Sequence, residues 1–377
     1  MNGKGFVLAW YYHSPSVSTD EEIKDMIVTS LNPLLSLHKE CSCQFTLAIT
    51  GSLLKRINNI DKSILNLMKD LIDSKILEIS ATFYYEIFPP LIPYNYIKLQ
   101  LKEDINTKKE LLGIKPSVFY PPNFTWVSIL RHLLLDLGIR YVILDEGHYN
   151  HCFKVQTWKW NFFKTNKMET LLIDTLLDKK ELYKIYKHNV KDENINLVLF
   201  FRSFDIIKKL SFGNSGLLHS PFDWTNLEKY LSNIISQLNF GDYITIADDG
   251  DRINPVSLYN YEKFLRNFDD IDFVFPSSID FTKVDLHNVP YLPSYSLGDL
   301  SLFWLRDLDS KHYIYLLDYI YSSNYFPKEL EEDLMELQDV YFIFWKNIPR
   351  KKYYMNKLYN ILESLENIQD IEKIPKN

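Results

Sequence analysis

The sequence predicts an α/β fold with a parallel sheet, either open and doubly wound or closed into a barrel, followed by a small helical domain. Apolar runs typical of buried strands alternate with helical segments over residues 6–275, which is the pattern of consecutive βαβ units. From residue 298 onward helical patterns dominate. The length of 377 residues accommodates a barrel, which needs about 250, and an additional domain.

The clearest βαβ-type unit lies at residues 116–146. An apolar strand ends in Pro121-Pro122-Asn123, the following helix stops at Gly138, and a second apolar strand ends in Asp145-Glu146. In parallel sheets and barrels, the carboxyl ends of the strands surround one crevice, and chemistry is placed there. Asn123, Asp145 and Glu146 are therefore expected to face the same crevice.

The remaining elements follow in order along the chain. Further strands are predicted at residues 6–12, 44–49, 77–81, 197–201, 243–247 and 273–275, with additional candidates at 158–162 and 171–174. Helices are predicted at residues 20–39, 53–57, 63–74, 96–112, 127–137, 179–188, 224–238 and 258–268, and a polar insertion at 187–195. The C-terminal helices are predicted at 300–321, 330–345 and 351–366. A boundary near Pro293 divides the chain into domains 1–292 and 293–377.

The composition predicts a soluble cytoplasmic protein. Hydrophobic residues make up 46% of the chain, enough for a packed core. A net charge of −7 and scattered Lys and Arg argue against nucleic acid or a membrane surface as a partner. Three cysteines form no disulfide framework and favour a reducing compartment. No apolar run reaches about 18 residues, the length of a membrane span. The oligomeric state is not predicted.

Neither a metal nor a cofactor is expected. His148-x-x-His151-Cys152 and Cys41-x-Cys43 together offer zinc ligands, but their spacings match no common closed zinc site. Gly213-x-x-Gly216 is followed by two leucines, whereas a phosphate-binding loop requires Lys and then Ser or Thr.

Seven short motifs occur in an order that resembles glycoside hydrolase family 57. They are His13-x-Pro15, Thr50-Gly51-Ser52-Leu53, Leu77-Glu78 with Tyr84-Tyr85-Glu86 and the prolines of 89–93, Tyr120-Pro121-Pro122, Gly138-Ile139-x-Tyr141, Phe201-Arg202 and Asp248-Asp249-Gly250. Residues 337–341 resemble part of the helical domain that follows the family's barrel. The resemblance implies an incomplete TIM-like barrel of the (β/α)7 type. It also implies retaining chemistry on an α-glucan or maltooligosaccharide, as in α-amylases, 4-α-glucanotransferases, branching enzymes and amylopullulanases.

The resemblance also implies which residues carry the chemistry. Retaining glycosidases use two carboxyl groups about 5 to 5.5 Å apart, one as nucleophile and one as general acid/base. The acid falls on Asp249, with Asp251 where a glutamate is expected. The nucleophile falls on Asn123, because the family's Trp-Pro-Pro-Glu-like motif is Tyr120-Pro121-Pro122-Asn123 here. An amide is a very poor nucleophile, and losing a covalent nucleophile costs roughly 10⁶-fold in turnover, so catalysis is expected to be impaired.

Other candidate substrate contacts lie at strand ends or within these motifs. They are His13, Glu78, Glu86, Tyr120, Trp126, Asp145, Glu146, Arg202 and Asp251. Arg202 is expected either to orient an acid by a forked hydrogen bond or to form a surface salt bridge. Asn123 either bonds a sugar or caps the helix that follows it. Tyr12, Tyr85, Tyr120, Trp126 and Trp224 either stack on sugar rings or pack in the core.

Three functions remain open on the sequence alone. The first is an α-glucan-active hydrolase or transferase that kept catalysis or rerouted it through Glu86, Asp145 or Glu146. The second is a non-catalytic carbohydrate-binding or regulatory protein on the same barrel. The third is a structural barrel that binds another protein. Saccharide binding without product release separates the second from the first, and the absence of any saccharide binding leaves the third.

Overall fold

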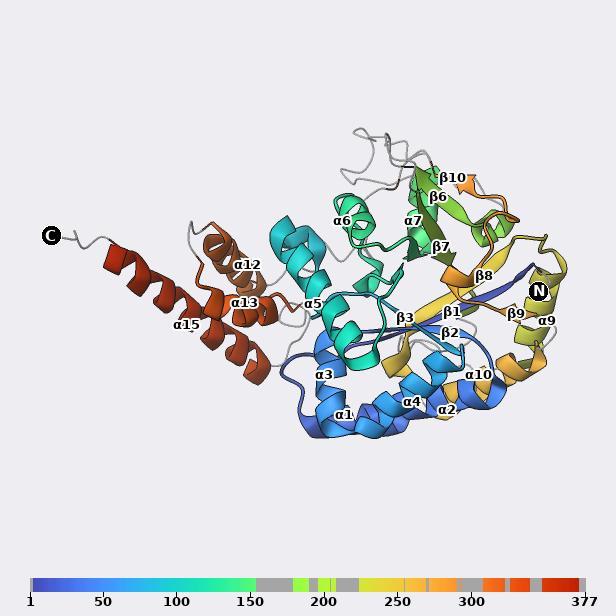
Figure 1. Ribbon diagram of the computed structural model, residues 1–377, viewed down its shortest axis with the longest axis horizontal. Coiled ribbons are helices and arrows are strands. Elements are labelled where there is room, and N and C mark those ends of the chain that lie inside the picture. The colour runs from blue at the N-terminus through green and yellow to red at the C-terminus, as the bar shows by residue number, and fades with distance from the viewer. Residues whose placement is uncertain are drawn as a thin grey trace, which may run out of the picture.

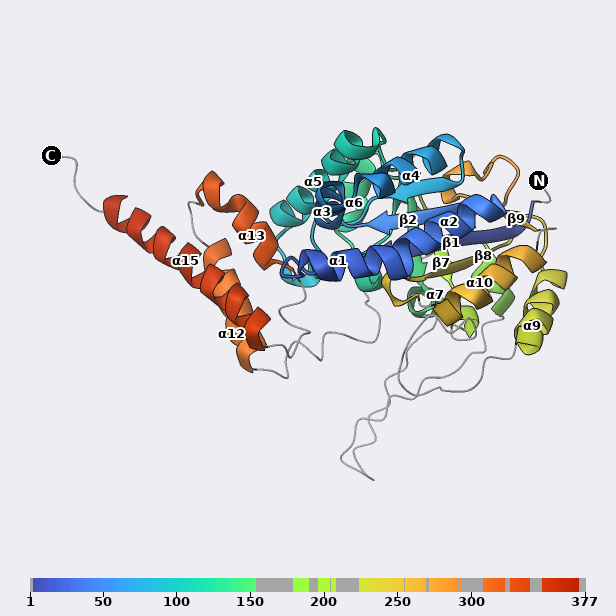
Figure 2. The same cartoon turned by 90° about the horizontal axis from the view of Figure 1, so that it is seen from below.

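The computed structural model describes residues 3–153, 179–189, 196–203, 205–207, 224–253, 255–268, 271–289, 292, 308–322, 326–339 and 348–372. Within these ranges, the chain forms a barrel with surrounding helices and a group of C-terminal helices at one end of the molecule (Figures 1 and 2). None of the helices in these ranges is both long and apolar enough to cross a bilayer.

Seven parallel strands form a closed ring. They are β1 (Gly5–Tyr12), β2 (Phe45–Ile49), β3 (Leu77–Ser80), β4 (Val118–Phe119), β5 (Tyr141–Asp145), β7 (Asn196–Arg202) and β8 (Tyr243–Asp249). Neighbours in this order pair with one another, and β8 pairs with β1 from Gly5↔Tyr243 to Tyr11↔Asp249. Two of these strand pairings rest on a single residue pair. β3 and β4 are connected by the bridge between Ala81 and Phe119, and β7 and β8 by the pair Arg202↔Thr245. The predicted parallel barrel is therefore confirmed, and the open sheet is wrong.

Both faces of the barrel strands are buried, which explains their nearly continuous apolar sequences. In β1, the side chains of Val7, Ala9 and Tyr11 belong to the inner cluster of the barrel. Those of Phe6, Leu8, Trp10 and Tyr12 belong to the cluster between the strands and the helices. The two-residue alternation of a strand therefore decides which side chains face the barrel interior.

Except at residues 146–153, where no helix was predicted, the helices described around the barrel agree broadly with the predicted ones. They are α1 (Asp20–Met26), α2 (Asn32–Cys41), α3 (Gly51–Ile60), α4 (Lys62–Asp73), α5 (Tyr94–Leu112), α6 (Leu130–Asp136), α7 (Glu146–Phe153), α9 (Trp224–Ser236) and α10 (Pro255–Asn267). The predicted helix 20–39 contains a π-helical turn, η1 (Ile27–Leu31), directly before Pro33 at the start of α2. Because proline lacks an amide hydrogen, it interrupts the α-helical bonding pattern, and the wider turn occurs at this point.

One predicted helix is wrong. Residues 179–188 form a short 3-10 helix, η4 (Lys179–Tyr183), and then the strand β6 (Tyr186–Asn189). β6 pairs antiparallel with β7, with Tyr186 opposite Leu199, so tertiary pairing overrides the helical propensity of this segment. The predicted polar insertion begins inside β6, and its part beyond residue 189 lies outside the described residues, as do the strand candidates 158–162 and 171–174. Two short strands, β9 (Asp272–Phe273) and β10 (His287–Asn288), extend the sheet.

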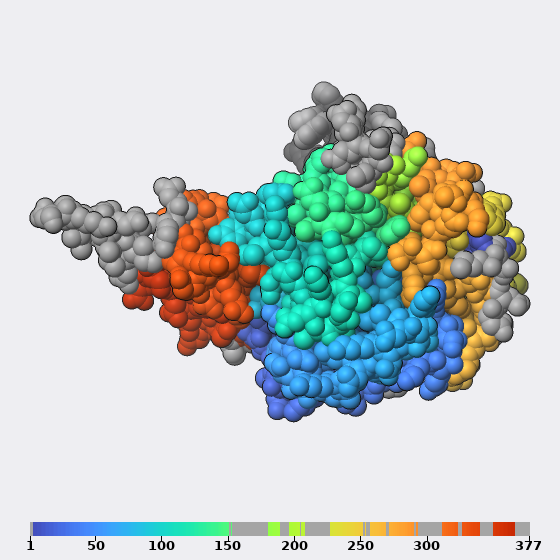
Figure 3. All heavy atoms as spheres, viewed as in Figure 1, coloured from blue at the N-terminus to red at the C-terminus, as the bar shows by residue number. Residues whose placement is uncertain are grey.

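The C-terminal helices have a hydrophobic cluster of their own. They are α12 (Leu308–Tyr321), the 3-10 helix η8 (Lys328–Leu330), α13 (Glu331–Leu337) and α15 (Ile348–Glu372). Their apolar faces meet around Tyr313, Leu334, Tyr354 and Leu358. This group adjoins the part of the surface that α5 forms (Figures 1 and 3). The predicted helical character is confirmed, while the boundary near Pro293 lies outside the described residues and remains a prediction.

Candidate active site

The carboxyl ends of the barrel strands bring most of the predicted site residues together. These residues are His13 after β1, Glu86 after β3, Tyr120 and Asn123 after β4, Asp145 in β5, Arg202 in β7 and Asp249 in β8. Tyr11 connects two of them, since its ring lies parallel to the rings of His13 and Tyr120 at centroid distances of 5.2 and 5.5 Å. We call this group the mouth cluster.

Asn123, Glu86 and His13 form a buried polar chain. Asn123 Nδ2 donates to Glu86 Oε1 at 2.7 Å, and His13 Nε2 lies 3.0 Å from Glu86 Oε2. His13 and Glu86 are 8% and 6% exposed, so their interaction is little weakened by solvent. An amide donates to a carboxylate, whereas a second carboxylate at position 123 would repel Glu86. Asn123 is thus chemically matched to Glu86.

The backbone at Asn123 explains how its side chain reaches Glu86. Asn123 has φ 49° and ψ 25°, in the left-handed region that asparagine tolerates better than most residues. Pro121 and Pro122 precede it and open a 3-10 turn, η3 (Pro122–Phe124). The helix-capping alternative is wrong, because α6 begins only at Leu130 and has no side-chain cap.

Arg202 forms the second polar group of the mouth. It is 1% exposed, so the surface salt bridge is wrong. Its Nε donates to Asp145 Oδ2 at 2.6 Å, and its Nη1 donates to Ala247 O at 2.9 Å and to Asp248 Oδ1 at 3.3 Å. Burial lowers the pKa of Arg202, but Asp145 and Asp248 outweigh it and hold the pKa above its usual value. The guanidinium carbon also lies 4.0 Å from the centre of the Phe124 ring, a cation–π contact.

Asp145 is fully engaged by these contacts. Its Oδ2 accepts from Arg202, and its Oδ1 accepts from the backbone amide of Gly147 at 2.7 Å. A carboxylate whose two oxygens accept hydrogen bonds from an arginine and a backbone amide is less available to attack a carbon.

Tyr120 lies between the two polar groups. It is 1% exposed, and its hydroxyl has no hydrogen-bond partner within the described part of the chain. Burial raises its pKa well above the usual value, Arg202 opposes this, and Asp249, Asp248 and Asp145 add to it. The negative charge of Asp249 therefore acts on the Tyr120 hydroxyl. Asp249 ends β8 opposite Tyr11, whose side chain belongs to the inner cluster of the barrel.

Glu78 and Trp126 lie elsewhere. Glu78 is near the start of β3, at the opposite end of the barrel, where it accepts hydrogen bonds from Thr46 and Ser277. Burial raises the pKa of Glu78 to about 7. Trp126 is 1% exposed and packs in the layer between strands and helices. The structure therefore corrects the expectation that Glu78 and Trp126 lie with the mouth cluster.

Glu146 and Asp251 are associated with side chains of that same outer layer. Burial, and to a smaller degree Glu146, raises the pKa of Tyr183 to about 12. Asp251, in the 3-10 helix η5 (Gly250–Arg252), adds to a rise in the pKa of Tyr12 that is caused mainly by burial. Both tyrosines belong to the outer cluster, so these two acids act electrostatically on the layer between strands and helices.

The aromatic candidates divide in the same way. Tyr12 and Tyr85 pack in the outer cluster, Tyr120 faces the mouth, and the side chain of Trp224 lies outside the described residues. Sequence reasoning missed Tyr11 and Phe124. The alternation of the first strand was a sufficient signal for Tyr11, which lies two residues before His13. No sequence signal indicated the positive φ of 49° that orients Phe124.

No metal site is evident in the described ranges, where no group of three or more His, Cys, Asp or Glu side chains is arranged to hold an ion. His148 is fully buried in α7, and Cys41 and Cys43 lie at the end of α2 and just after it. A cavity of about 480 Å³ lies beside the mouth loops, between Phe88–Ile92 and α12, and its lining includes none of the mouth cluster.

Comparison with known proteins adds independent information. The sequence model of Glycosyl hydrolase family 57 matches residues 12–274. A search of curated proteins gave no match. Similar solved structures include a 4-alpha-glucanotransferase from Thermococcus litoralis, with 17% identity, a TM-score of 0.61, and coverage of 90% of this chain and 46% of that one. This chain therefore spans about half the length of that relative.

Two further structures match over most of their length. A branching enzyme from Thermococcus kodakaraensis has 12% identity and a TM-score of 0.67, with 95% of this chain and 88% of that one covered. The alpha-amylase AmyC from Thermotoga maritima has 12% identity and a TM-score of 0.65, with 97% and 93% covered. At these identities the structural likeness shows the shared fold.

Proposed function

Because the chain belongs to glycosyl hydrolase family 57, we propose that its barrel mouth binds α-glucans or maltooligosaccharides and that cleavage is impaired by Asn123. The three similar structures carry the names of a glucanotransferase, a branching enzyme and an amylase, which supports an α-glucan ligand. The proposal includes a cytoplasmic location and a barrel of residues 1–292 followed by a helical domain of residues 293–377. Separate hydrophobic clusters support this division.

The hydrogen bond from Asn123 to Glu86 carries the proposal. It makes position 123 a donor of hydrogen bonds, whereas retaining cleavage requires an attacking carboxylate there. Asp249 keeps the position of the proton donor. With an acid and no nucleophile, the mouth retains groups that bind sugar hydroxyls but lacks the group that forms the covalent intermediate.

The other carboxylates of the mouth are poorly suited to replace the nucleophile. Glu86 is engaged by Asn123 and His13, and Asp145 is engaged by Arg202 and Gly147. These contacts favour a carbohydrate-binding or regulatory protein over catalysis rerouted through either residue. The electrostatic effect of Glu146 on Tyr183, a residue of the outer cluster, disfavours it as well.

The test combines binding and product formation. Calorimetry measures binding of a maltooligosaccharide series to the wild type, and chromatography measures product release by the wild type, Asn123→Glu, and Asn123→Glu combined with Asp249→Asn. Asn59→Glu is the matched control, since it makes the same change at an exposed position of α3. We expect wild-type binding without release, a gain of release in Asn123→Glu, and its loss in the double variant.

Two outcomes would overturn the proposal. If the wild type binds no saccharide, the barrel is better explained as a structural partner of another protein. If the wild type releases product at a rate that the Asn123→Glu substitution does not raise, a different nucleophile is present and catalysis is not impaired. Loss of that release in Glu86→Gln would identify Glu86 as the replacement.

A further inference from the structure

The segment of residues 335–339, at the end of α13, contacts both loops that carry the His13–Glu86 pair. These loops follow β1 and β3, which are separated in the barrel by β2. The two side chains therefore do not inherit their relative position from adjacent strands. Their 3.0 Å contact requires that the two loops be fixed with respect to each other.

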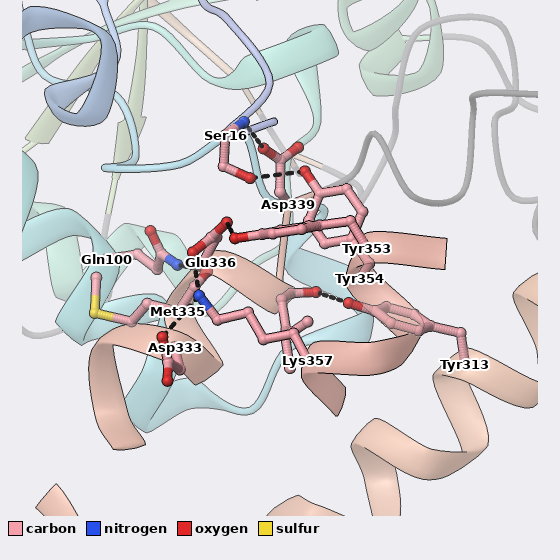
Figure 4. Close-up of polar contacts among 11 residues, drawn as sticks. Ser16, Gln100, Tyr313, Asp333, Met335, Glu336, Asp339, Tyr353, Tyr354 and Lys357 are labelled. Carbon is pink, nitrogen blue, oxygen red and sulfur yellow. Dashed lines mark hydrogen bonds and ion pairs between the residues drawn. The ribbon is translucent and has the colours of Figure 1, made fainter. Parts of the chain in front are cut away.

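Gln100 ties the Glu86 loop to this segment. The Gln100 side chain is fully buried on α5. Its Oε1 accepts from the backbone amide of Tyr85 at 3.0 Å, directly before Glu86. Its Nε2 donates to Met335 O and Gln338 Oε1, both at 2.9 Å. Figure 4 shows Gln100 beside Met335 at the junction of α5 and α13.

Asp339 contacts both loops. Its backbone forms an antiparallel bridge with Ile87, directly after Glu86, so both neighbours of Glu86 are held. Its Oδ2 accepts from the backbone amide of Ser16 at 3.2 Å, three residues after His13. Ser16 Oγ also forms a 2.8 Å hydrogen bond with the Tyr354 hydroxyl of α15, as Figure 4 shows.

The segment is itself anchored within the C-terminal helices. The Tyr313 hydroxyl of α12 donates to Leu337 O at 2.5 Å. Lys357 of α15 pairs with Asp333 at 2.7 Å and with Glu336. The segment is thus held on one side by two helices and on the other by two loops of the barrel mouth (Figure 4).

We propose that Asp339 and Gln100 are positioning residues for the His13–Glu86 pair, so that contacts with the C-terminal helices fix the relative position of the two loops that carry this pair. The inference rests on the proposed function for its ligand. It does not require catalysis, because it concerns the geometry of groups that bind the sugar.

The test is a double-mutant cycle on maltooligosaccharide affinity. We expect Asp339→Ala to weaken binding about tenfold or more in the wild-type background, since it removes a charge-assisted hydrogen bond that holds the site. In a Glu86→Gln background, the same substitution should change affinity less than about twofold. If Asp339 acts on affinity through Glu86, the effects of the two substitutions do not add. Asp339→Asn keeps an acceptor oxygen for Ser16 and should restore most of the affinity. Asp333→Ala is the control, since Asp333 pairs with Lys357 but touches neither loop.

A second measurement needs no sugar. The ring nitrogen resonances of His13, assigned with a His13→Gln variant, report its contact with Glu86. Asp339→Ala should move them toward their position in Glu86→Gln, and Asp333→Ala should leave them in place. If Asp339→Ala does not fold, Tyr354→Phe removes only the hydroxyl that bonds Ser16 and should move them in the same direction.

The outcomes separate this proposal from the proposed function. If the wild type binds no maltooligosaccharide but the His13 resonances respond as expected, the positioning stands and the assigned ligand is wrong. The positioning is refuted if the resonances in the Asp339→Ala variant, or in Tyr354→Phe where that replaces it, match those of the wild type. It is also refuted if the effects of Asp339→Ala and Glu86→Gln on affinity add in full.

Discussion

Asn123 Nδ2 donates a 2.7 Å hydrogen bond to Glu86 Oε1, which joins the turn after β4 to the loop after β3. The partner of residue 123 is therefore a carboxylate oxygen, which needs a hydrogen-bond donor. The amide is part of a matched arrangement in which His13 contacts the other oxygen of Glu86. A carboxylate at position 123 would alter the charge balance of this group as well as its hydrogen bonding.

Asn123→Asp tests this match with nearly the same side-chain volume. We expect a loss of about 1.5–3 kcal/mol in the free energy of unfolding at pH 7, because a donor is replaced by a charge beside Glu86. Repulsion raises the pKa of one of the two carboxyls in the folded state. The deficit is therefore largest above that pKa and shrinks as pH falls toward 4. Urea unfolding at pH 7 and pH 4.5 measures it. Asn59→Asp is the control, and equal deficits at both pH values would contradict the explanation.

Arg202→Met should be strongly destabilising. It leaves Asp145 buried without its cationic partner, and breaking a buried ion pair from one side costs about 3–5 kcal/mol. Thermal and urea unfolding give the loss. The matched control is Lys55→Met, because Lys55 and its partner Glu103 are 42% and 36% exposed. A pair that exposed is worth about 1 kcal/mol or less. Similar losses of stability in both variants would show that the buried Arg202 pair contributes no more than an exposed ion pair.

Glu78→Gln should make stability less dependent on pH. The folded-state pKa of Glu78 is raised from 4.5 to about 7 by burial. Its favourable contribution is therefore fully present below about pH 4.5 and is lost as pH rises through about 7. Between pH 5 and pH 8, the free energy of unfolding of the variant should therefore rise by up to about 3 kcal/mol relative to that of the wild type. Unfolding at both pH values tests this, with Glu110→Gln, an exposed position on α5, as control. If the difference in free energy of unfolding between variant and wild type is the same at both pH values, burial of the Glu78 charge does not cause the pH dependence.

Tyr120→Phe separates sugar binding from folding. The Tyr120 hydroxyl has no partner within the described part of the chain, so removing it should leave the melting temperature almost unchanged. If the hydroxyl bonds a sugar, maltooligosaccharide affinity falls by about 3- to 10-fold, corresponding to about 0.5–1.5 kcal/mol. Calorimetry gives the affinity. Tyr243→Phe, at the opposite end of the barrel, should have no effect on it. If the affinity of Tyr120→Phe equals that of the wild type, the Tyr120 hydroxyl does not contact the sugar.

The sequence predicted the barrel well because buried parallel strands are apolar on both faces. The runs that became β1, β2, β5, β7 and β8 are clear for this reason. β6 was missed because the four residues Tyr186–Asn189 are too few to show the two-residue alternation that identifies a strand. The π-helical turn before Pro33 was also beyond prediction, since its extra residue leaves the helical pattern almost unchanged.

The site was predictable only in part. Residues at strand ends gather by topology, which explains the grouping of His13, Asp145 and Arg202. Glu78 was misplaced because it lies on a correctly predicted strand but near its beginning, where the side chain faces the far end of the barrel. The contacts of Gln100 and Asp339 depend on the docking of α13 against α5, and no local pattern encodes that docking.

The pairing of β1 with β8 also has a consequence for synthesis of the chain. Residues 5–11 find this neighbour only at residues 243–249, about 240 residues later. Synthesis proceeds at about 5–20 residues per second. The edge of β1 that pairs with β8 therefore stays uncovered for roughly 12 to 48 s after β1 emerges. Over that interval its free edge is available to chaperones and to other nascent chains, which exposes this strand to incorrect pairing during synthesis.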